Sequence, residues 1–585
     1  MTASLAFGPF GDAAVLAEAG DLTTAQELAA MVDGGARAGA WPGIEEVVLG
    51  STSVTVVLDP GQADPAAMSD ALRQAWAADV SHPRGRGRGR VADVAQARFE
   101  VRVRFDGPDL DEVAALVGST PSHVVARLTG ADLEVAFLGF SPGFAYLHGL
   151  PPDLAVLARR ERPRPVVPAG SVALGGGFAA VYPQSTPGGW HLVGRSDAEL
   201  FDPERPPYAS LAPGRRVRLV STEDDLAPPP PLWRPALSGA GAAGLAVERG
   251  GACTLVEDGG RIGVAALGVP RAGAADPVAA RLANRLLGNP DDVAVLEVTA
   301  AGPRLRSSGA AVVCVIGDPE RPGLVELQVD GHRAPEGSVL QLEAGQVVDV
   351  GSCAPAVRAV IAVAGGFDTP AVLGSRSADL LCGLGPAPLQ PGDVLDIGIA
   401  GRPRGRLGPW PDVRPRAASQ PSSVPVRLRV LPGPDAPHPG PRGDPTEGEW
   451  VVMPESNRVG VRLRRPEGLR RPEGLRRPEG GKPVTPSVPE WPARPGPGSR
   501  GMVIGAVQLP PGGEAIVLGP DHATVGGYPV PAVVISADLY RLAHLAPGAT
   551  VRFDAVDSSD ARTARHALGR VVDRAVSGWF PTRAG

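Results

Sequence analysis

Lysine is almost missing from this chain of 585 residues, in which Lys482 is the only one. A P-loop, a Schiff base and a biotinyl group each need a lysine in a defined setting. Lys482 stands in "GGKPV", which has neither the spacing of a P-loop nor the pattern of a following helix. A nucleotide or biotin would therefore have to be held by another chain or by a different kind of site.

Cysteine and long apolar runs are scarce as well. The four cysteines, at 253, 314, 353 and 382, are far apart and form no CxxC pair. They predict buried thiols of a reducing compartment, and neither a zinc site nor a disulfide framework. No apolar run is long enough to span a membrane, and the first residues lack the basic and apolar regions of a signal peptide. The net charge of −6 gives no reason to expect nucleic-acid or membrane partners, so we expect a cytoplasmic protein.

Proline, glycine and arginine divide the chain into segments. Ser81–Asp93 is a Gly/Arg linker, Ala227–Gly244 is a polyproline run followed by small residues, and Pro409–Pro425 is a weaker boundary. "LRRPEG" occurs three times in tandem from Leu463 to Gly480, where Pro and Gly in every unit exclude a helix or a central strand. The predicted segments are a domain at 1–80, a domain at 91–226, a linker at 227–243, and domains at 244–410 and 421–585, the last with a repeat-expanded loop at 463–498.

Short β-branched runs alternate with turns between these boundaries. Strands are expected at 54–60, 99–105, 310–317 and 357–366. Two helices are expected, at Pro108–Gly118 and at Asp276–Asn289; in the second, Asp276 fits the N-cap and Pro277 the first helical position. This pattern predicts a mainly β protein with several barrels or sandwiches and few helices.

Four aromatic residues surround one tight turn in a chain with only 4% aromatic residues. The stretch "AFLGFSPGFAYLHGLP" places Phe137, Phe140, Phe144 and Tyr146 around Pro142, and a Pro-Gly pair suits the centre of a type II turn. These aromatic residues would form either a local hydrophobic core or a rigid apolar wall beside a binding cleft. Both interpretations stay open at this point.

Long motifs on both sides of the proline-rich linker resemble known families. "FLGFSPGFAYL", "VPAGSVALGG" and "YPQSTPGGWHLVGR" resemble the allophanate-hydrolase-subunit-1 family, which includes the B subunit of 5-oxoprolinase and Kip-type kinase inhibitors. "GVPRAGAADPVAARLANRLLGNPDDVAVLEVTAAGP", "ESNRVGVRL" and "GPDHATVGGYP" resemble the subunit-2 family, which includes the C subunit of 5-oxoprolinase. The chain therefore resembles a fusion of the two. This resemblance implies a mainly β fold with α/β elements, in which several cyclophilin-like β-barrel domains follow a small N-terminal α/β domain.

The chain departs from the family pattern at several positions. Leu128 stands where a histidine usually precedes the first aromatic strand, and "VQDLGR" becomes "VEDGGR" at 256–261. Ala272 replaces a serine, and Ala523 replaces a glutamine. These replacements put any catalytic role of those side chains in doubt, and the sequence does not decide whether they reduce activity.

The resemblance implies the B–C component of an ATP-dependent 5-oxoprolinase, which hydrolyses 5-oxo-L-proline to L-glutamate together with a separate A subunit. ATP and Mg²⁺ are the implied cofactors, and biotin is not expected on this chain. Arginine suits carboxylate and phosphoryl groups, and carboxylates suit proton transfer. The predicted catalytic residues are Asp276, Glu297 and Asp521. The predicted substrate-binding residues are Phe140, Phe144, Tyr146, Arg195, Asn457, Arg458, Gln508, Thr524 and Tyr528, and no metal ligand is assigned.

Some of these residues also have a structural interpretation. Asp276 could act as a helix cap alone, Glu297 could pair with Arg281 or Arg304, and Arg195 could belong to a surface ion pair. Two other functions stay open: the carboxyltransferase component of a urea-carboxylase-like, biotin-dependent system, and a Kip-type regulator that binds a histidine kinase. The sequence does not decide between 5-oxoproline and a urea-like amide as substrate, nor how the ATP site is divided within a complex, nor whether the chain forms a homo-oligomer.

Overall fold

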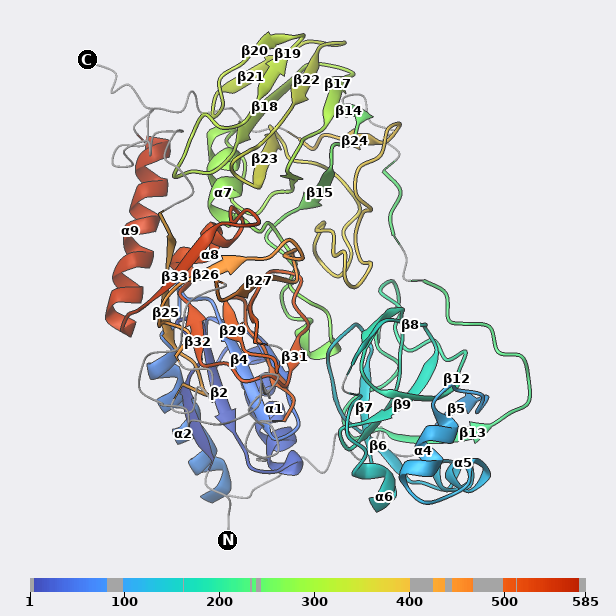
Figure 1. The fold of residues 1–585 in the computed structure, drawn as a ribbon. Helices are drawn as coiled ribbons and strands as arrows, with labels where there is room; N and C mark the ends of the chain where they lie inside the picture. Colours follow the sequence, from blue (N-terminus) through green and yellow to red (C-terminus); the bar gives the residue numbers. More distant parts are fainter. Residues whose placement is uncertain are drawn as a thin grey trace, which may run out of the picture.

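The computed structural model describes most of the chain (Figure 1). The described residues are 5–81, 98–160, 162–231, 234–237, 244–399, 424–436, 444–466, 498–511 and 513–577. Lys482, most of the predicted boundary at 409–425 and nearly all of the predicted loop at 463–498 lie outside them. No helix within these ranges is long and apolar enough to cross a membrane.

The first domain is a four-stranded antiparallel sheet with two helices. Its strands, in the order β1-β2-β4-β3, are β1 (Ala6–Pro9), β2 (Ala14–Glu18), β3 (Ile44–Leu49) and β4 (Ser53–Leu58), and its helices are α1 (Leu22–Arg37) and α2 (Pro65–Ser81). The carboxylate of Asp21 caps α1 by accepting a hydrogen bond from the Thr24 N–H at 2.8 Å. Leu28 and Val32 of α1 share a buried core with Val56 of β4, so the helix covers one face of the sheet.

The second domain is built on a seven-stranded sheet with the order β12-β9-β10-β7-β6-β13-β5. Its strands are β5 (Phe99–Val103), β6 (Leu133–Leu138), β7 (Ala145–His148), β9 (Ser171–Gly175), β10 (Phe178–Val181), β12 (His191–Arg195) and β13 (Arg216–Ser221). A two-stranded sheet of β8 (Arg164–Val167) and β11 (Thr186–Gly188) and the helices α4 (Leu110–Leu116), α5 (Pro121–Thr129) and α6 (Pro152–Ala155) complete it. β13 pairs in parallel with β5, which ties the end of this domain to its beginning.

The third domain consists of two sheets and one prominent helix. The six-stranded sheet has the order β20-β19-β22-β17-β14-β24, with β14 (Gly244–Arg249), β17 (Arg304–Ser307), β19 (Leu327–Val329), β20 (His332–Arg333), β22 (Val347–Val350) and β24 (Val394–Asp396). The five-stranded sheet has the order β15-β16-β23-β18-β21, with β15 (Cys253–Glu257), β16 (Val295–Thr299), β18 (Ala311–Ile316), β21 (Val339–Leu342) and β23 (Arg358–Val363). α7 (Pro277–Leu286) packs against β18 and β23, because its apolar face shares a core with theirs.

The fourth domain is a closed barrel with the order β25-β32-β29-β30-β27-β26-β33. Its strands are β25 (Val426–Pro432), β26 (Trp450–Val452), β27 (Gly460–Arg464), β29 (Ala506–Gln508), β30 (Ala515–Leu518), β32 (Ala532–Val534) and β33 (Thr550–Ala555). A two-stranded sheet of β28 (Arg500–Gly501) and β31 (Val525–Gly526), together with the helices α8 (Leu539–Leu542) and α9 (Ser558–Ser577), completes this domain.

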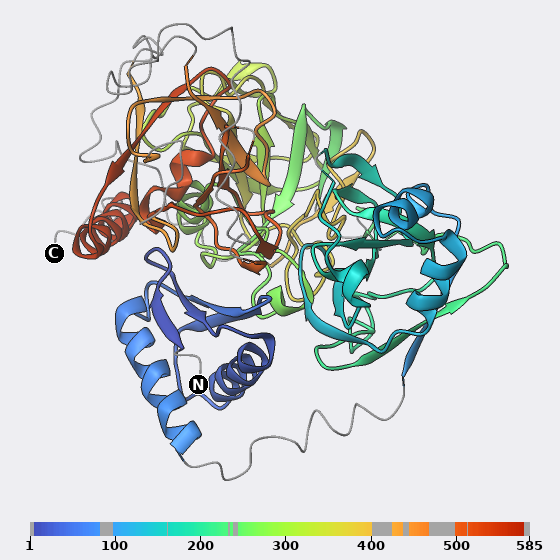
Figure 2. The same cartoon turned by 60° about the horizontal axis from the view of Figure 1, so that its bottom comes forward.

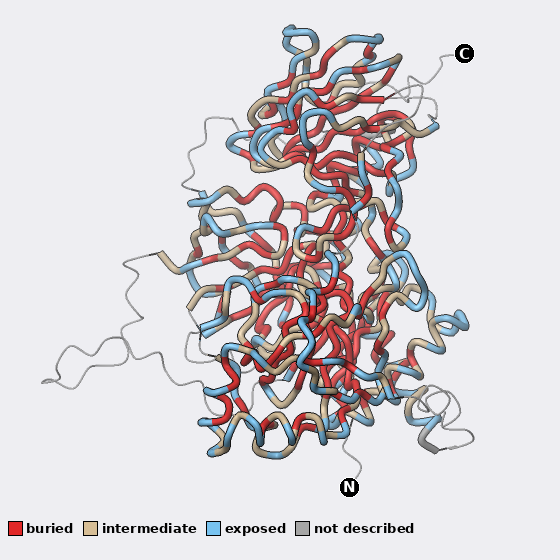
Figure 3. Tube along the Cα trace, turned by 90° about the vertical axis from the view of Figure 1, so that its right-hand side faces the viewer, coloured by how far each residue is buried: buried red, intermediate tan, exposed pale blue. Residues whose placement is uncertain are grey.

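The first domain packs against the fourth, although the two are far apart in the sequence (Figures 1 and 2). Phe10 and Leu16, from the face of the sheet opposite α1, share a buried core with Val533 of the barrel. The carboxylate of Asp12 accepts hydrogen bonds from the backbone and side chain of Ser536 at 2.9 and 2.7 Å. Figure 3 shows the buried parts of the trace running through the middle of the molecule. The half of the chain before the proline-rich linker (the first half) thus contributes a domain to the surface of the half that follows it (the second half).

The expected mainly β fold with a small N-terminal α/β domain is confirmed. β4, β5, β18 and β23 occupy the four expected strands, and α4 and α7 occupy the two expected helices. The sequence patterns did not predict α1, α2 or α9; in α1, the pair Gly34 and Gly35 weakens the helical pattern. Only one sheet closes into a barrel among the described residues. The domain limits given above for 1–80, 91–226, 244–410 and 421–585 stay predictions.

Candidate functional site

A cavity of about 600 Å³ lies where three of the four domains meet. Glu46 lines it from the first domain, Arg271 and Arg358 from the third, and Arg458 and His522 from the fourth. Both halves of the chain therefore contribute to one site. The volume lies in the usual range for small-molecule pockets, about 300–1,000 Å³.

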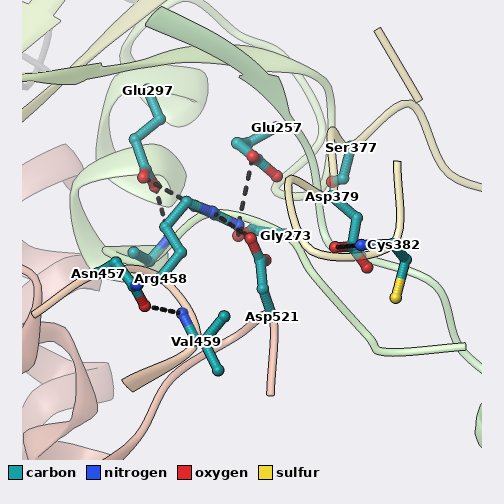
Figure 4. Close-up of polar contacts among 12 residues, drawn as sticks. Glu257, Gly273, Glu297, Ser377, Asp379, Cys382, Asn457, Arg458, Val459 and Asp521 are labelled. Atoms are coloured by element: carbon teal, nitrogen blue, oxygen red, sulfur yellow. Dashed lines mark hydrogen bonds and ion pairs between the residues drawn. The ribbon is translucent and has the colours of Figure 1, made fainter. Parts of the chain in front are cut away.

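Arg458 stands at the wall of this cavity and is only 5% exposed. Its Nε and Nη2 donate to the two carboxylate oxygens of Asp521 at 2.9 and 2.8 Å, and its Nη1 donates to Oε1 of Glu297 at 2.7 Å. Nη2 also donates to the carbonyl oxygen of Gly273 at 2.8 Å (Figure 4). Asn457 stabilises the turn that contains Arg458, because its Oδ1 accepts a hydrogen bond from the Val459 N–H at 2.9 Å. Arg458 therefore joins the third and fourth domains through buried, charge-assisted hydrogen bonds.

Glu297, in the strand β16, receives donors from several directions. Besides Arg458, its Oε1 accepts from Nε of Arg358 at 3.1 Å, and its Oε2 accepts from the Ala275 N–H at 2.7 Å. Burial by itself would raise the pKa of Glu297, but Arg458 and Arg358 hold it below its ordinary value. Glu297 is therefore an ionised carboxylate that two arginines share.

Two further buried acids belong to this neighbourhood, Glu257 beside Arg458 and Asp379 near Asp521 (Figure 4). Glu257, at the end of β15, has no exposed surface, and its Oε1 lies 3.2 Å from Nη2 of Arg458. Asp379 accepts a hydrogen bond from the Cys382 N–H at 2.8 Å. Burial, and after it the charge of Asp521, raises the pKa of Asp379 to about 7. Arg458 therefore contacts three buried carboxyl groups, of which Asp521 and Glu297 accept its hydrogen bonds and Glu257 does not.

Asp276 caps α7 and contacts a histidine from the fourth domain. Its Oδ1 accepts hydrogen bonds from the N–H groups of Val278 and Ala279 at 2.9 and 2.8 Å. Its Oδ2 lies 2.7 Å from Nε2 of His544. Burial raises the pKa of Asp276, although His544 acts in the opposite direction. The capping interpretation of Asp276 thus holds, and the predicted catalytic role stays a prediction.

The remaining predicted residues of the second half differ in their surroundings. Asn457 and Thr524 line the cavity, and the buried Oγ1 of Thr524 has no hydrogen-bond partner among the described residues. The side-chain amide of Gln508 donates to Sδ of Met502 at 3.2 Å. Tyr528 is 41% exposed. Of these predicted residues, only Thr524 combines a place in the cavity lining with a buried side-chain polar atom that has no partner among the described residues.

The ion pairs of Arg195, Arg281 and Arg304 test the structural interpretations suggested for these residues. Arg195 pairs with Asp106 at 3.0 Å and with a second aspartate on the surface of the second domain. Arg281 and Arg304 pair with carboxylates other than Glu297. The suggested pairing of Glu297 with Arg281 or Arg304 is therefore wrong, because Glu297 pairs with Arg358 of the neighbouring strand and with Arg458 of the fourth domain. Arg195 is committed to a surface ion pair, and its predicted contact with a substrate anion stays a prediction.

The aromatic turn forms part of a buried core. Phe144 and Tyr146 are 1% and 5% exposed, and the ring of Phe144 packs edge-on against Phe140 and Trp190 with centroids 5.3 and 5.7 Å apart. Neither Phe140, Phe144 nor Tyr146 lines the cavity of about 600 Å³. This location agrees with the core interpretation, and the predicted contact of the three residues with a substrate stays a prediction.

The same turn also contacts the second half of the chain. The N–H of Gly143 donates to the carbonyl oxygen of Leu267 at 2.9 Å. Gly268, with φ +81°, lies so close to Ser141 that a Cβ on it would meet the Ser141 carbonyl oxygen at 2.2 Å. Glycine is therefore required for this approach of two backbones. The aromatic core stiffens a turn that serves as a contact between the two halves.

The first domain contacts residues 263–265, which lie just before Leu267 and Gly268 in the chain. The carboxylate of Glu46 accepts hydrogen bonds from the N–H groups of Gly263 and Ala265 at 2.6 and 3.0 Å. Burial raises the pKa of Glu46, although these hydrogen bonds oppose the effect. The segment 258–275, which forms one wall of the cavity and leads into α7, is thus positioned by both domains of the first half.

Seven of the charged or titratable residues described at this site were not predicted from the sequence: Glu46, Glu257, Arg271, Arg358, Asp379, His522 and His544. Glu257 ends the otherwise apolar run "CTLV" of a buried strand, and Asp379 stands next to a leucine pair. Acidic residues are rarely fully buried. An acidic residue inside a run that predicts a buried strand therefore indicates an unusual environment. Arg358 and His544 carry no comparable signal, because arginine and histidine commonly stand at the ends of strands and helices.

The residues at the cavity do not fit Mg²⁺ or the triphosphate of ATP. All carboxylate oxygens of Asp521 and Glu297 accept N–H hydrogen bonds. Within the described ranges, no group of three or more His, Cys, Asp or Glu side chains could hold a metal ion. The arginines that line the cavity are already paired with carboxylates: Arg271 with Glu45, Arg281 with Asp291, Arg358 with Glu297, and Arg458 with Asp521.

Two family models match this chain, and together they cover both halves. The carboxyltransferase domain, subdomain C and D, matches residues 5–211, and the carboxyltransferase domain, subdomain A and B, matches residues 267–555. The 5-oxoprolinase C subunit of Escherichia coli (strain K12) is 31% identical over 56% of this chain and 97% of the relative. The chain belongs to the carboxyltransferase-domain family.

Relatives of two different 5-oxoprolinase subunits are matched by this one polypeptide. The 5-oxoprolinase B subunit of Escherichia coli O157:H7 is 37% identical over 31% of the chain and 80% of the relative. A fused arrangement is also found in a solved structure, since the crystal structure of TTHA0988 aligns with 94% of this chain and 100% of that chain, with a TM-score of 0.74 and 31% identity. The chain is thus a fusion of the counterparts of the B and C subunits.

Proposed function

We propose that this protein is the B–C component of an ATP-dependent 5-oxoprolinase, which opens 5-oxo-L-proline to L-glutamate together with a separate A subunit. The observation that carries this proposal is the cavity of about 600 Å³, because residues of both halves line it. The counterparts of the B and C subunits would then act on one ligand. A five-membered cyclic amide with one carboxylate is small enough for this space.

The reaction sets clear demands on the site. Hydrolysis breaks the C–N bond of the ring amide, and water supplies a hydroxyl group to the carbonyl carbon and a proton to the nitrogen. A ring amide is a poor electrophile. Transfer of the terminal phosphoryl group of ATP to its carbonyl oxygen would release ADP and activate the carbonyl carbon, and a second water would release that group as inorganic phosphate. Because the residues at the cavity do not fit the nucleotide or Mg²⁺, we place both on the A subunit. We assign to this chain the binding and orientation of the amide.

Two polar groups at the cavity wall can make those contacts. Four of the five N–H groups of Arg458 are used by Asp521, Glu297 and Gly273, which leaves one on Nη1 within the described part of the chain. We assign that N–H to the carboxylate of the substrate and the hydroxyl of Thr524 to the ring amide. Asp521 and Glu297 orient Arg458, so their contribution would be that of positioning residues.

The test is an assay of glutamate and phosphate release from 5-oxoproline and ATP, with the full-length chain alone and with the purified A subunit of 5-oxoprolinase. Release is expected only when both proteins are present. Turnover by the chain alone, or no turnover when the two proteins are mixed, would contradict the proposal.

A pair of threonine variants examines the site within that assay. Thr524→Val should raise KM for 5-oxoproline, because it removes the hydroxyl at the cavity. Thr369→Val is the matched control, since Thr369 is equally buried at 3% exposure and also lacks a partner for its hydroxyl among the described residues, but does not line the cavity. Equal effects of the two variants on KM would remove Thr524 from the substrate site.

The family models are described as carboxyltransferase subdomains. We therefore keep one alternative, a biotin-dependent carboxyl transfer to a urea-like amide. Biotin would have to arrive on a partner chain, because the only lysine here is Lys482. Incorporation of labelled bicarbonate into urea, in the presence of a biotin carboxylase and a biotin carrier protein, would favour this alternative over the amide hydrolase.

A further inference from the structure

Glu257 is a carboxyl group inside the protein with no hydrogen bond to either of its oxygens. Its exposed fraction is 0%, and both carboxyl oxygens are buried without a partner among the described residues. A buried, ionised carboxylate is stable only when hydrogen bonds and a paired charge replace its hydration. A neutral carboxylic acid in the same place costs much less, so the surroundings of Glu257 decide its state.

Arg458 is close to Glu257 but cannot give it a hydrogen bond. Oε1 of Glu257 lies 3.2 Å from Nη2 of Arg458. The two N–H groups on that nitrogen already donate to the carbonyl oxygen of Gly273 and to Oδ1 of Asp521, both at 2.8 Å. A guanidinium nitrogen of this kind carries only two hydrogens. Glu257 therefore touches the guanidinium without sharing its donors.

The hydrogen-bonded cluster of Arg458, Arg358, Glu297 and Asp521 is neutral without Glu257. The groups that face it are Arg458, Glu297 and Asp521, together with the hydroxyl of Ser377, whose hydrogen is donated to Asp258 at 2.7 Å. Arg358 adds a second positive charge through its hydrogen bond to Glu297. The two arginines and two carboxylates of this cluster sum to zero. Two nearby charges, Arg261 on the carbonyl oxygen of Ser377 and Asp258 on its hydroxyl, also offset each other. An ionised Glu257 would therefore add one negative charge in the interior that no hydrogen bond compensates, which is strongly unfavourable.

We propose that Glu257 is a neutral, protonated carboxylic acid and acts as a positioning residue for Arg458. It fills the space beside Nη2 and does not compete with Glu297 and Asp521 for the positive charge of the guanidinium. The remaining N–H of Arg458 then keeps its positive charge for the attraction of an anionic group in the cavity. This role is independent of which amide or other ligand the cavity binds.

Burial also acts on the titration of this group in the direction that the geometry requires. Burial raises the pKa of Glu257 well above its ordinary value of 4.5, and Arg458 only partly opposes this effect. A group whose pKa is raised in the folded state stabilises the fold fully below the ordinary pKa, and this contribution is lost as the pH rises toward the folded pKa. The wild-type protein should therefore lose stability above pH 4.5 because of this residue.

The experiment measures the melting temperature of the full-length wild type, Glu257→Gln and Glu257→Ala from mildly acidic to mildly alkaline pH. Glutamine has the shape of a neutral glutamic acid and does not titrate. The melting temperature of Glu257→Gln should equal or exceed that of the wild type at neutral pH, and the difference should grow as the pH rises. Glu257→Ala should melt lower throughout, because it leaves a cavity beside Arg458, and glutamine should rescue this loss.

Two controls keep the proposal falsifiable. Glu297→Gln removes a carboxylate that is ionised, so it should lower the melting temperature at neutral pH, opposite to Glu257→Gln. The infrared spectrum of the wild type should contain a band of a protonated carboxyl group that is absent from Glu257→Gln. A Glu257→Gln variant that fails to fold, or that loses more stability as the pH rises, would overturn the proposal, and so would the absence of that band.

Discussion

Arg458 and Asp521 face each other as two parallel forks. Nε and Nη2 of Arg458 donate to the two oxygens of Asp521 at 2.9 and 2.8 Å, across a buried contact within the fourth domain. This bidentate geometry fixes the plane of the guanidinium and so directs Nη1 toward Glu297 in the third domain. A contact inside one domain thereby controls how the next domain is bound.

Replacement of Arg458 should therefore lower the free energy of unfolding. Arg458→Gln leaves Asp521 and Glu297 buried without their shared positive charge, and we expect a loss of about 3–5 kcal/mol in the free energy of unfolding. Arg427→Gln is the matched control, because Arg427 also makes two hydrogen bonds to one aspartate, Asp554, but its side chain is 68% exposed. Urea denaturation at neutral pH measures both, and equal small losses would show that the buried network contributes little.

The pH dependence of stability should reveal Asp379. Its pKa is raised from 3.8 to about 7, so its protonated form is favoured by the fold. The contribution is complete below pH 3.8 and is lost as the pH rises through about 7. Asp379→Asn should flatten this part of the curve of unfolding free energy against pH. Asp33→Asn, on the exposed side of α1, should leave the curve unchanged; a similar change in both variants would argue against Asp379 as the titrating group.

The aromatic turn should behave as a core. Phe144→Ala should cost about 3–5 kcal/mol, because it removes a buried ring that contacts several other aromatic rings. Leu116→Ala serves as the control, since Leu116 is 60% exposed and the change should stay within about 0.5 kcal/mol. Near wild-type melting of Phe144→Ala with a selective loss of activity would instead support the cleft-wall interpretation.

Two helix caps of the same chemistry should differ in their importance. Asp21→Ala removes the exposed cap of α1 and should cost about 0.5–2 kcal/mol, the usual range for an N-cap. Asp276→Ala removes the cap of α7 and also leaves the buried His544 without its partner, which adds about 1–3 kcal/mol. Thermal and urea unfolding of the two variants compare them directly. Equal losses would mean that the contact with His544 is neutral.

Local signals in the sequence were enough for many elements of this fold. The β-branched runs of β18 and β23 and the Asp276-Pro277 pair before α7 act within a few residues, so their structures follow from short stretches of sequence. The pairing partners of the charges do not. Arg458 was predicted as a site residue, yet its neighbour Glu257 was not, because the two meet only after the third and fourth domains pack.

The aromatic turn is a second case in which local sequence does not predict a contact between distant residues. The sequence predicts a turn at Pro142 and an apolar cluster around it, and both are present. The hydrogen bond from Gly143 to Leu267 connects residues of different halves, so no pattern near either residue could indicate it. The contact of this turn with the other half of the chain thus depended on a partner more than a hundred residues away.

Segment 258–275 is held by Glu46 and by the turn at Gly143, which both belong to the other half of the polypeptide. Two separate chains that met in this way would come apart by mass action when diluted. A covalent link makes the contact intramolecular and so removes that dependence on concentration. Each polypeptide therefore carries both walls of the cavity in a one-to-one ratio, and the two walls stay together at any concentration of the protein.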